Sequence, residues 1–102
     1  MEKITLEEAK SKYGAVQMAE NTDEKGNPIV CYFKQPSRLV LGAAMGEIDR
    51  NPLIACEYIF DDSVIREISD VDAFRSNDSV FLGITGMLQS LVRVKKSTFT
   101  SL

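Results

Sequence analysis

Residue types that commonly carry catalysis are sparse in this sequence. It contains no histidine, and its two cysteines, Cys31 and Cys56, lie far apart rather than in a CxxC pair. A serine or cysteine nucleophile needs a base, and that base is usually histidine. Zinc sites of the usual Cys/His type are likewise excluded for a monomer. The sequence therefore predicts neither a nucleophilic enzyme nor a zinc protein.

Carboxylates are the remaining candidates for chemistry. Asp61 and Asp62 are adjacent, so a regular element would point them apart, and we interpret them as a turn or cap. EF-hand spacing is absent. No GxxxxGK[ST] loop occurs, and Gly83–Gly86 is too short and too helical to bind phosphate. A magnesium or calcium site built from dispersed acids, and with it a small metal-dependent enzyme, stays open as an alternative. The main expectation is a non-enzymatic binding protein without a cofactor.

The charge of the chain limits its partners. A formal net charge of −3 gives no field that attracts phosphate, so we expect no nucleic acid partner. Between Glu47 and Asp78 there are nine acidic residues and three arginines, whereas Arg93–Lys96 is basic. We interpret these segments as a solvated acidic face and a solvated tail. The alternative is an acidic surface that meets a basic partner.

The sequence also bears on location. Met1–Lys12 is charged and has no apolar core of a signal peptide, and no apolar run approaches the ~18 residues of a membrane span. We therefore expect no membrane contact and a cytoplasmic protein with reduced thiols.

Capping residues and turn residues set the expected elements in the first half. Thr5 and Glu8 have capping-box spacing, which predicts a helix that ends at Gly14. Ala15–Met18 is a weak strand, and Glu20–Pro28 is a polar loop or hairpin connection. Ile29–Lys34 is the best strand, with Ile29, Cys31 and Phe33 on one face and Val30 and Tyr32 on the other.

Three further helices are predicted. Ser37 caps one that runs to about Asp49, and Asn51-Pro52 opens another that ends at Asp61–Ser63. Val64–Ile68 is either a short strand or a helical turn, and Ser69–Ser76 is an acidic connector. The last helix spans Ser79 to about Leu91, with an apolar stripe of Phe81, Ile84, Leu88 and Leu91. Gly42 and Gly46 lie four residues apart, which suits close approach of another element.

Together these elements predict an α+β fold. A single, helix-dominated domain spans residues 1–102, with a small antiparallel sheet and about three helices on one face. Val92–Lys95 is expected to return as a strand beside Ile29–Lys34, and Ser97–Leu102 to form a frayed tail.

The stretch Tyr32–Leu53 resembles the tail assembly chaperones of long-tailed bacteriophages and prophages. The resemblance rests on Phe33-Lys34, Pro36-Ser37-Arg38 and Asn51-Pro52, and on a second block, Asn77–Lys95, with a polar cap, an apolar helix and Val92-Arg93-Val94-Lys95. Where several relatives have a Trp-Gly-Gly-like turn, this chain has Tyr58–Asp62.

This resemblance implies a chaperone that keeps the apolar, helical tape measure protein in solution until tail tube subunits assemble around it. Such proteins use no cofactor. A compact domain with spare apolar surface suits the role, and methionines suit adaptable surfaces. The residues expected to contact the partner are Met45, Tyr58, Phe60, Phe81 and Met87. A homo-oligomer is left open, and so is a structural tail or head-tail component that stays in the particle.

Overall fold

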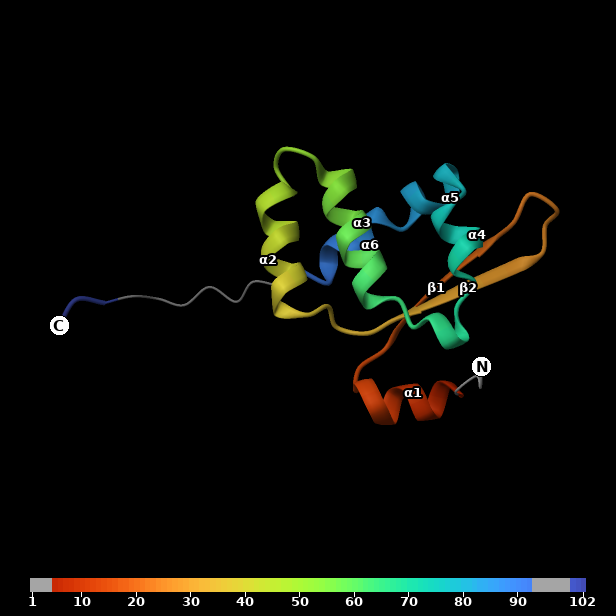
Figure 1. Cartoon of the computed structure of the whole chain (residues 1–102), viewed down its shortest axis with the longest axis horizontal. Coiled ribbons are helices and arrows are strands. Elements are labelled where there is room, and N and C mark those ends of the chain that lie inside the picture. The colour runs from red at the N-terminus through yellow and green to blue at the C-terminus, as the bar shows by residue number, and fades with distance from the viewer. Residues whose placement is uncertain (1–4, 93–99) are drawn as a thin grey trace.

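A computed structural model describes residues 5–92 and 100–102, and it confirms the α+β class. Within these residues, six α-helices, a short 3-10 helix and a two-stranded antiparallel sheet follow one another (Figure 1). The elements are α1 (Leu6–Tyr13), β1 (Gln17–Thr22), β2 (Pro28–Phe33), α2 (Arg38–Glu47), α3 (Pro52–Ser63), η1 (Arg66–Ile68), α4 (Val71–Arg75), α5 (Asp78–Gly83) and α6 (Thr85–Ser90). None of the described helices has the length and apolarity needed to cross a bilayer.

The sheet is a hairpin whose first strand is longer than predicted. Gln17 lies opposite Phe33 and Thr22 opposite Pro28, so the strand pairing extends into the polar segment expected to be a loop. Asp23 holds the turn, because its Oδ1 accepts hydrogen bonds from the backbone N–H groups of Lys25 (2.9 Å) and Asn27 (2.8 Å). Hydrogen bonds to β2 thus keep polar residues in a strand that their propensities do not favour.

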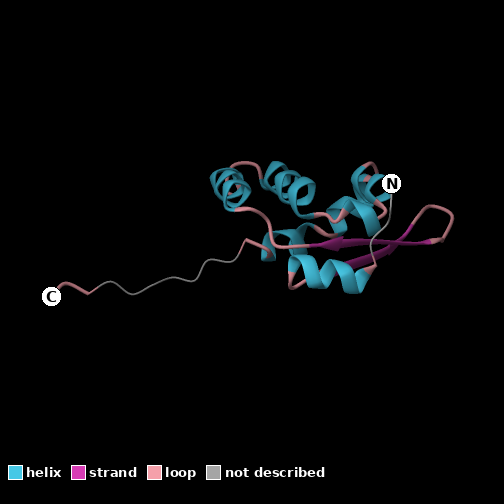
Figure 2. Ribbon diagram, turned by 60° about the horizontal axis from the view of Figure 1, so that its bottom comes forward, coloured by secondary structure: helices cyan, strands magenta, loops and turns pink. Residues whose placement is uncertain are grey.

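The alternation of β2 is as predicted. Ile29, Cys31 and Phe33 are buried, whereas Val30 and Tyr32 are half-buried on the opposite face. Leu6 of α1 lies beside Val30 and Tyr32. Figure 2 shows α1 on one side of the hairpin and the α2–α3 pair on the other.

The free edge of β2 pairs with residues 63–70. The N–H of Lys34 donates to the carbonyl of Ser63, and the N–H of Ile65 donates to the carbonyl of Tyr32, both at 2.8 Å. At the other end of this paired edge, Asp70 Oδ2 accepts a hydrogen bond from the Val30 N–H at 2.8 Å. Residues 93–95 of the predicted strand Val92–Lys95 lie outside the described residues, as does part of the predicted tail Ser97–Leu102.

The predicted caps of the first three helices are confirmed. Thr5 Oγ1 accepts from the Glu8 N–H, Ser37 Oγ from the Val40 N–H, and Asn51 Oδ1 from the Ile54 N–H. α3 ends at Ser63, within the predicted segment Asp61–Ser63, but Asp61 and Asp62 lie inside its last turn rather than in a turn beyond the helix. Inside α3 the buried Ser63 hydroxyl donates to the Ile59 carbonyl, which lets a polar side chain stay in the helix.

Two further predictions need correction. Ser69–Ser76 is not merely a connector, because it contains α4, which buries Phe74. The last helix is divided at Ile84 (φ −108°, ψ 2°) into α5 and α6. Gly83 and Gly86 flank the break, and both have low helix propensity. The apolar stripe predicted for this last helix still faces the core, because all four of its residues are buried: Phe81, Ile84, Leu88 and Leu91.

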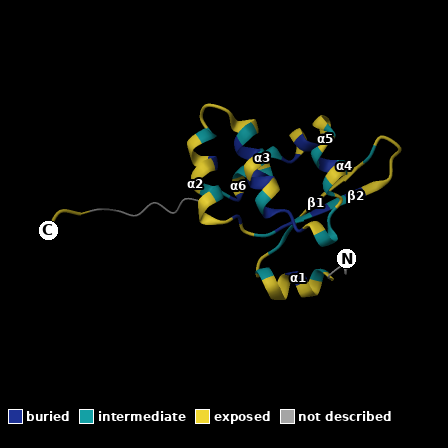
Figure 3. Ribbon diagram, in the orientation of Figure 1, coloured by how far each residue is buried: buried dark blue, intermediate teal, exposed yellow. Residues whose placement is uncertain are grey.

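Three phenylalanines connect the sheet to the helices in the core. The Phe60 ring lies between those of Phe33 and Phe81, at centroid distances of 5.5 and 5.6 Å, and both pairs are edge-to-face. α1 stands apart from this core and buries only Ala9 fully (Figure 3). Lys34 Nζ lies 4.7 Å from the Tyr13 ring centroid, which gives α1 a further contact with the sheet.

Candidate partner-binding surface

The structure separates the five predicted contact residues into two groups. Met45 and Tyr58 are exposed, at 51% and 43%. Phe60 and Phe81 are buried in the aromatic core, and Met87 is half-buried against it. Phe60 is therefore not on a surface, since its ring fills the space between two others.

Other exposed apolar side chains were not predicted from the sequence. Leu39 on α2 is 84% exposed and Leu82 on α5 is 57% exposed, and Leu53 at the start of α3 is also exposed. A helical projection offers a signal for Leu39, because it falls opposite Ala44, the one fully buried residue of α2. No comparable signal exists for Leu82, whose helix is apolar nearly all round.

A groove between α3 and α5 combines apolar lining with a charged rim. The whole groove has a volume of about 210 Å³, and Leu53, Phe81 and Leu82 form its apolar part. Arg75 lies at the rim, with Nε 3.2 Å from Asp61 Oδ1 and the guanidinium 5.4 Å from the Phe81 ring centroid. The hydrogen bond to Asp61 raises the pKa of Arg75. The groove can hold an apolar side chain beside fixed charges.

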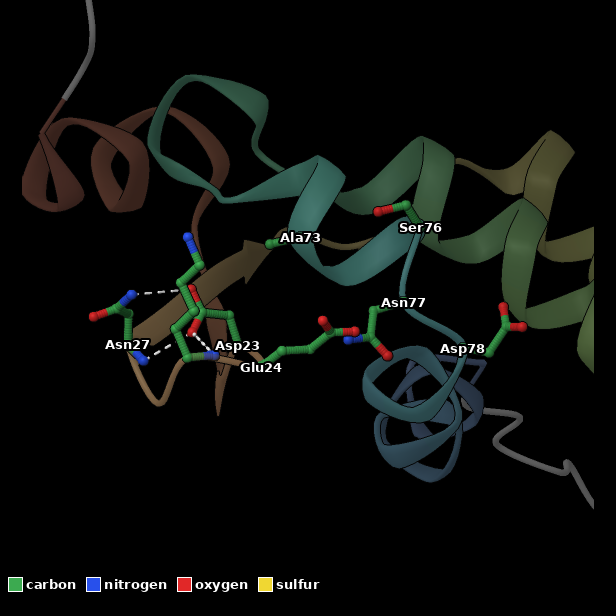
Figure 4. Close-up of a pocket in the computed structure, with 8 residues that line it drawn as sticks. Asp23, Glu24, Asn27, Ala73, Ser76, Asn77 and Asp78 are labelled. Carbon is green, nitrogen blue, oxygen red and sulfur yellow. Dashed lines mark hydrogen bonds between the residues drawn. The ribbon is translucent and has the colours of Figure 1, made fainter.

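A second hollow, of about 580 Å³, lies between the hairpin turn and the α4–α5 junction (Figure 4). Its polar groups mainly support the fold. Asp23 binds the turn, and the backbone hydrogen bond from Asn27 lowers the pKa of its carboxyl. Asn77 caps α5 by accepting from the Ser79 and Val80 N–H groups. Figure 4 shows Glu24 extended toward Asn77. Nowhere in the described part of the chain do three or more Cys, Asp or Glu side chains gather as a metal site would require.

The two cysteine thiols are buried and separate. Burial raises the pKa of Cys31 to about 12, and burial also raises the pKa of Cys56. Both thiols are therefore protonated near neutral pH, and neither is a thiolate nucleophile in this conformation.

The fold occurs in a solved structure. It is that of the uncharacterised protein rbstp2171 from Bacillus stearothermophilus. The alignment covers 95% of this chain and 100% of that one, with a TM-score of 0.63 and 20% sequence identity. No known protein family and no curated protein matches the sequence. Similarity at this level of identity extends to the fold alone.

Proposed function

We propose that this chain is a non-enzymatic tail assembly chaperone of a long-tailed bacteriophage or prophage. It would act in the cytoplasm of the bacterial host, where it binds the apolar helical tape measure protein. The observation that carries the proposal is the exposure of large apolar side chains on α2, α3 and α5: Leu39, Met45, Leu53, Tyr58 and Leu82. Side chains of this size on a small domain favour contact with another protein.

The groove between α3 and α5 suits one turn of an amphipathic helix. An apolar side chain from the partner would enter between Leu53 and Leu82, with Phe81 beneath it. The acidic rim residue Asp78 would meet lysine or arginine beside the apolar stripe of the partner, whereas Glu57 is already paired with Arg75 at 3.7 Å. Binding therefore needs shape and charge from this chain, and no cofactor.

Leu82→Asp tests the groove. We expect it to weaken binding of a tape measure fragment roughly 30-fold, because a residue central to a contact contributes about 2 kcal/mol. Fluorescence anisotropy with labelled fragments measures the change. Met18→Asp is a matched control, because Met18 is 51% exposed on β1 and does not line the groove.

Equal weakening by both variants, or no binding of any tape measure fragment by the parent, would overturn the proposal. Analysis of finished particles gives a second test, because a chaperone should be missing from them. If the chain is found there in stoichiometric amount, it is a structural tail component instead.

A further inference from the structure

The outer face of α2 (Leu39, Gly42, Ala43 and Gly46) is apolar and uncovered in the described part of the chain. Its residues follow a spacing of three and four, so they lie on one side of the helix, opposite the buried Ala44. Leu39 projects 84% of its surface into solvent. A Cβ atom placed on Gly42 or Gly46 would find no described atom within 4 Å beyond its own helix and chain neighbours.

Two glycines inside a helix are costly, at about 1 kcal/mol each relative to alanine. Within the described residues, no neighbouring element approaches close enough to require them. Their small size instead allows close approach by a helix from another molecule. Leu39 and Met45, both exposed on the same helix, would supply apolar area to such a contact.

Two charges near the ends of α2 indicate what that other helix is. Arg38 is the first residue of the helix, and Asp49 lies just past its end. Both charges oppose the helix dipole, which favours acids at the start and bases at the end. None of the ion pairs among described residues includes Arg38 or Asp49. They are eleven residues apart, close to three full turns, so they lie on the same flank.

We propose that the outer face of α2 pairs antiparallel with the same face of a second copy of this chain. A two-fold axis places the start of each helix beside the end of the other. Arg38 then meets Asp49 of the partner subunit, and this contact occurs twice. Leu39 covers the partner's Gly46, while Gly42 and Ala43 meet near the axis and let the helices approach closely.

The charge pattern favours a second copy over an unrelated helix. A base at one end and an acid at the other, on one flank, are complementary to themselves when the helix is reversed. Arg50 lies at the end of this face but is already paired with Glu47 at 2.9 Å, so its charge is satisfied within the chain. The helix is only ~15 Å long, so the interface is smaller than the standard ~1,600 Å². The dimer should therefore be weak and reversible.

Charge reversal tests the pairing. Sedimentation velocity between about 1 µM and about 1 mM should reveal the dimer of the parent chain. Arg38→Asp alone and Asp49→Arg alone should each raise the dimer dissociation constant roughly two- to tenfold, and the double variant should restore it. A double variant that dimerises no better than the singles would overturn the proposal.

Gly42→Leu tests the close approach. It should shift the protein to monomer, with more than about a tenfold rise in dissociation constant, while the thermal melt stays cooperative. Gly86→Leu is the matched control, because a Cβ at Gly86 also meets open space but lies on α6. Unchanged dimerisation of Gly42→Leu would overturn the proposal.

A parent chain that stays monomeric throughout would also overturn it. If Gly42→Leu then weakened binding of the tape measure fragment, this face would belong to the client. The groove between α3 and α5 is tested separately by Leu82→Asp, so failure of one proposal leaves the other distinguishable.

Discussion

The position of Leu88 in the core can be tested by substituting a charged side chain. It is fully buried in α6 and belongs to the apolar cluster that includes Phe60. Leu88→Asp would bury an unpaired carboxylate, which is too costly for a domain held by roughly 5–15 kcal/mol. We expect no cooperative thermal transition by circular dichroism. Leu82→Asp, at an exposed position, should melt near the parent temperature, and the same behaviour from Leu88→Asp would contradict the core assignment.

Asp23 makes the hairpin turn sensitive to acid. The backbone hydrogen bond from Asn27 lowers the pKa of its carboxyl below the ordinary 3.8. A lowered folded-state pKa contributes stability that is present above the unfolded value and is lost as pH falls through the folded value. The free energy of unfolding of the parent should therefore fall below about pH 4 more steeply than that of Asp23→Ala. Urea titrations at several pH values measure both slopes, and parallel slopes would show that the carboxylate does not support the turn.

At the scale of elements, the glycines of α2 lower the stability of the helix, and replacing one of them should raise it. A Cβ on Gly42 meets open space, so Gly42→Ala should add up to about 1 kcal/mol to the free energy of unfolding. Urea denaturation at low protein concentration, where any dimer is dissociated, measures this change. Gly14→Ala is the informative contrast, because Gly14 has φ +80° and the variant should destabilise the chain. Destabilisation by Gly42→Ala would mean that a neighbour packs against this glycine in solution.

Local signals explain why some elements could be predicted and others could not. Helix starts at Thr5, Ser37 and Asn51 could be predicted because each side chain accepts a hydrogen bond from the backbone N–H three residues later. Such local contacts depend only on neighbouring residues, so the sequence alone identifies them. The end of α3 depends on distant partners instead. Asp62 Oδ2 accepts from the Ser37 N–H at 2.7 Å, and Asp61 binds Arg75. The sequence predicted only a turn or cap for these acids and could not identify their partners, because neither partner is adjacent in sequence.

The same difference applies to the candidate surface. Met45 and Tyr58 were predicted as contact residues and are exposed, whereas Phe60 was predicted with them and lies at the centre of the core. An apolar residue on a helix carries no local mark of which neighbour will cover it. Leu82 is exposed because the chain places no element over it in the described residues, and only the assembled fold contains that information.

For the whole molecule, the arrangement of the core predicts which part opens first. α1 has eight residues and buries only Ala9 fully, outside the aromatic cluster (Figure 1). A helix of this length has little stability of its own. α3, by contrast, buries Cys56, Ile59 and Phe60 and contacts β2 through the Phe33–Phe60 pair. Local opening should therefore begin at α1.

Native-state hydrogen exchange tests this order. Amides of α1 should exchange by local opening, at rates insensitive to low denaturant, while those of α3 and β2 should require global unfolding. The variant Leu88→Val, which is expected to cost about 1 kcal/mol, is the control: it should speed exchange in α3 and leave α1 unchanged. A different result would contradict this order: α1 amides that exchange as slowly as those of α3 in the parent, and that also exchange faster in Leu88→Val. In that case α1 would belong to the same cooperative unit as α3. The packing of α1 on one face of the hairpin would then be as stable as the packing of α3 on the other face.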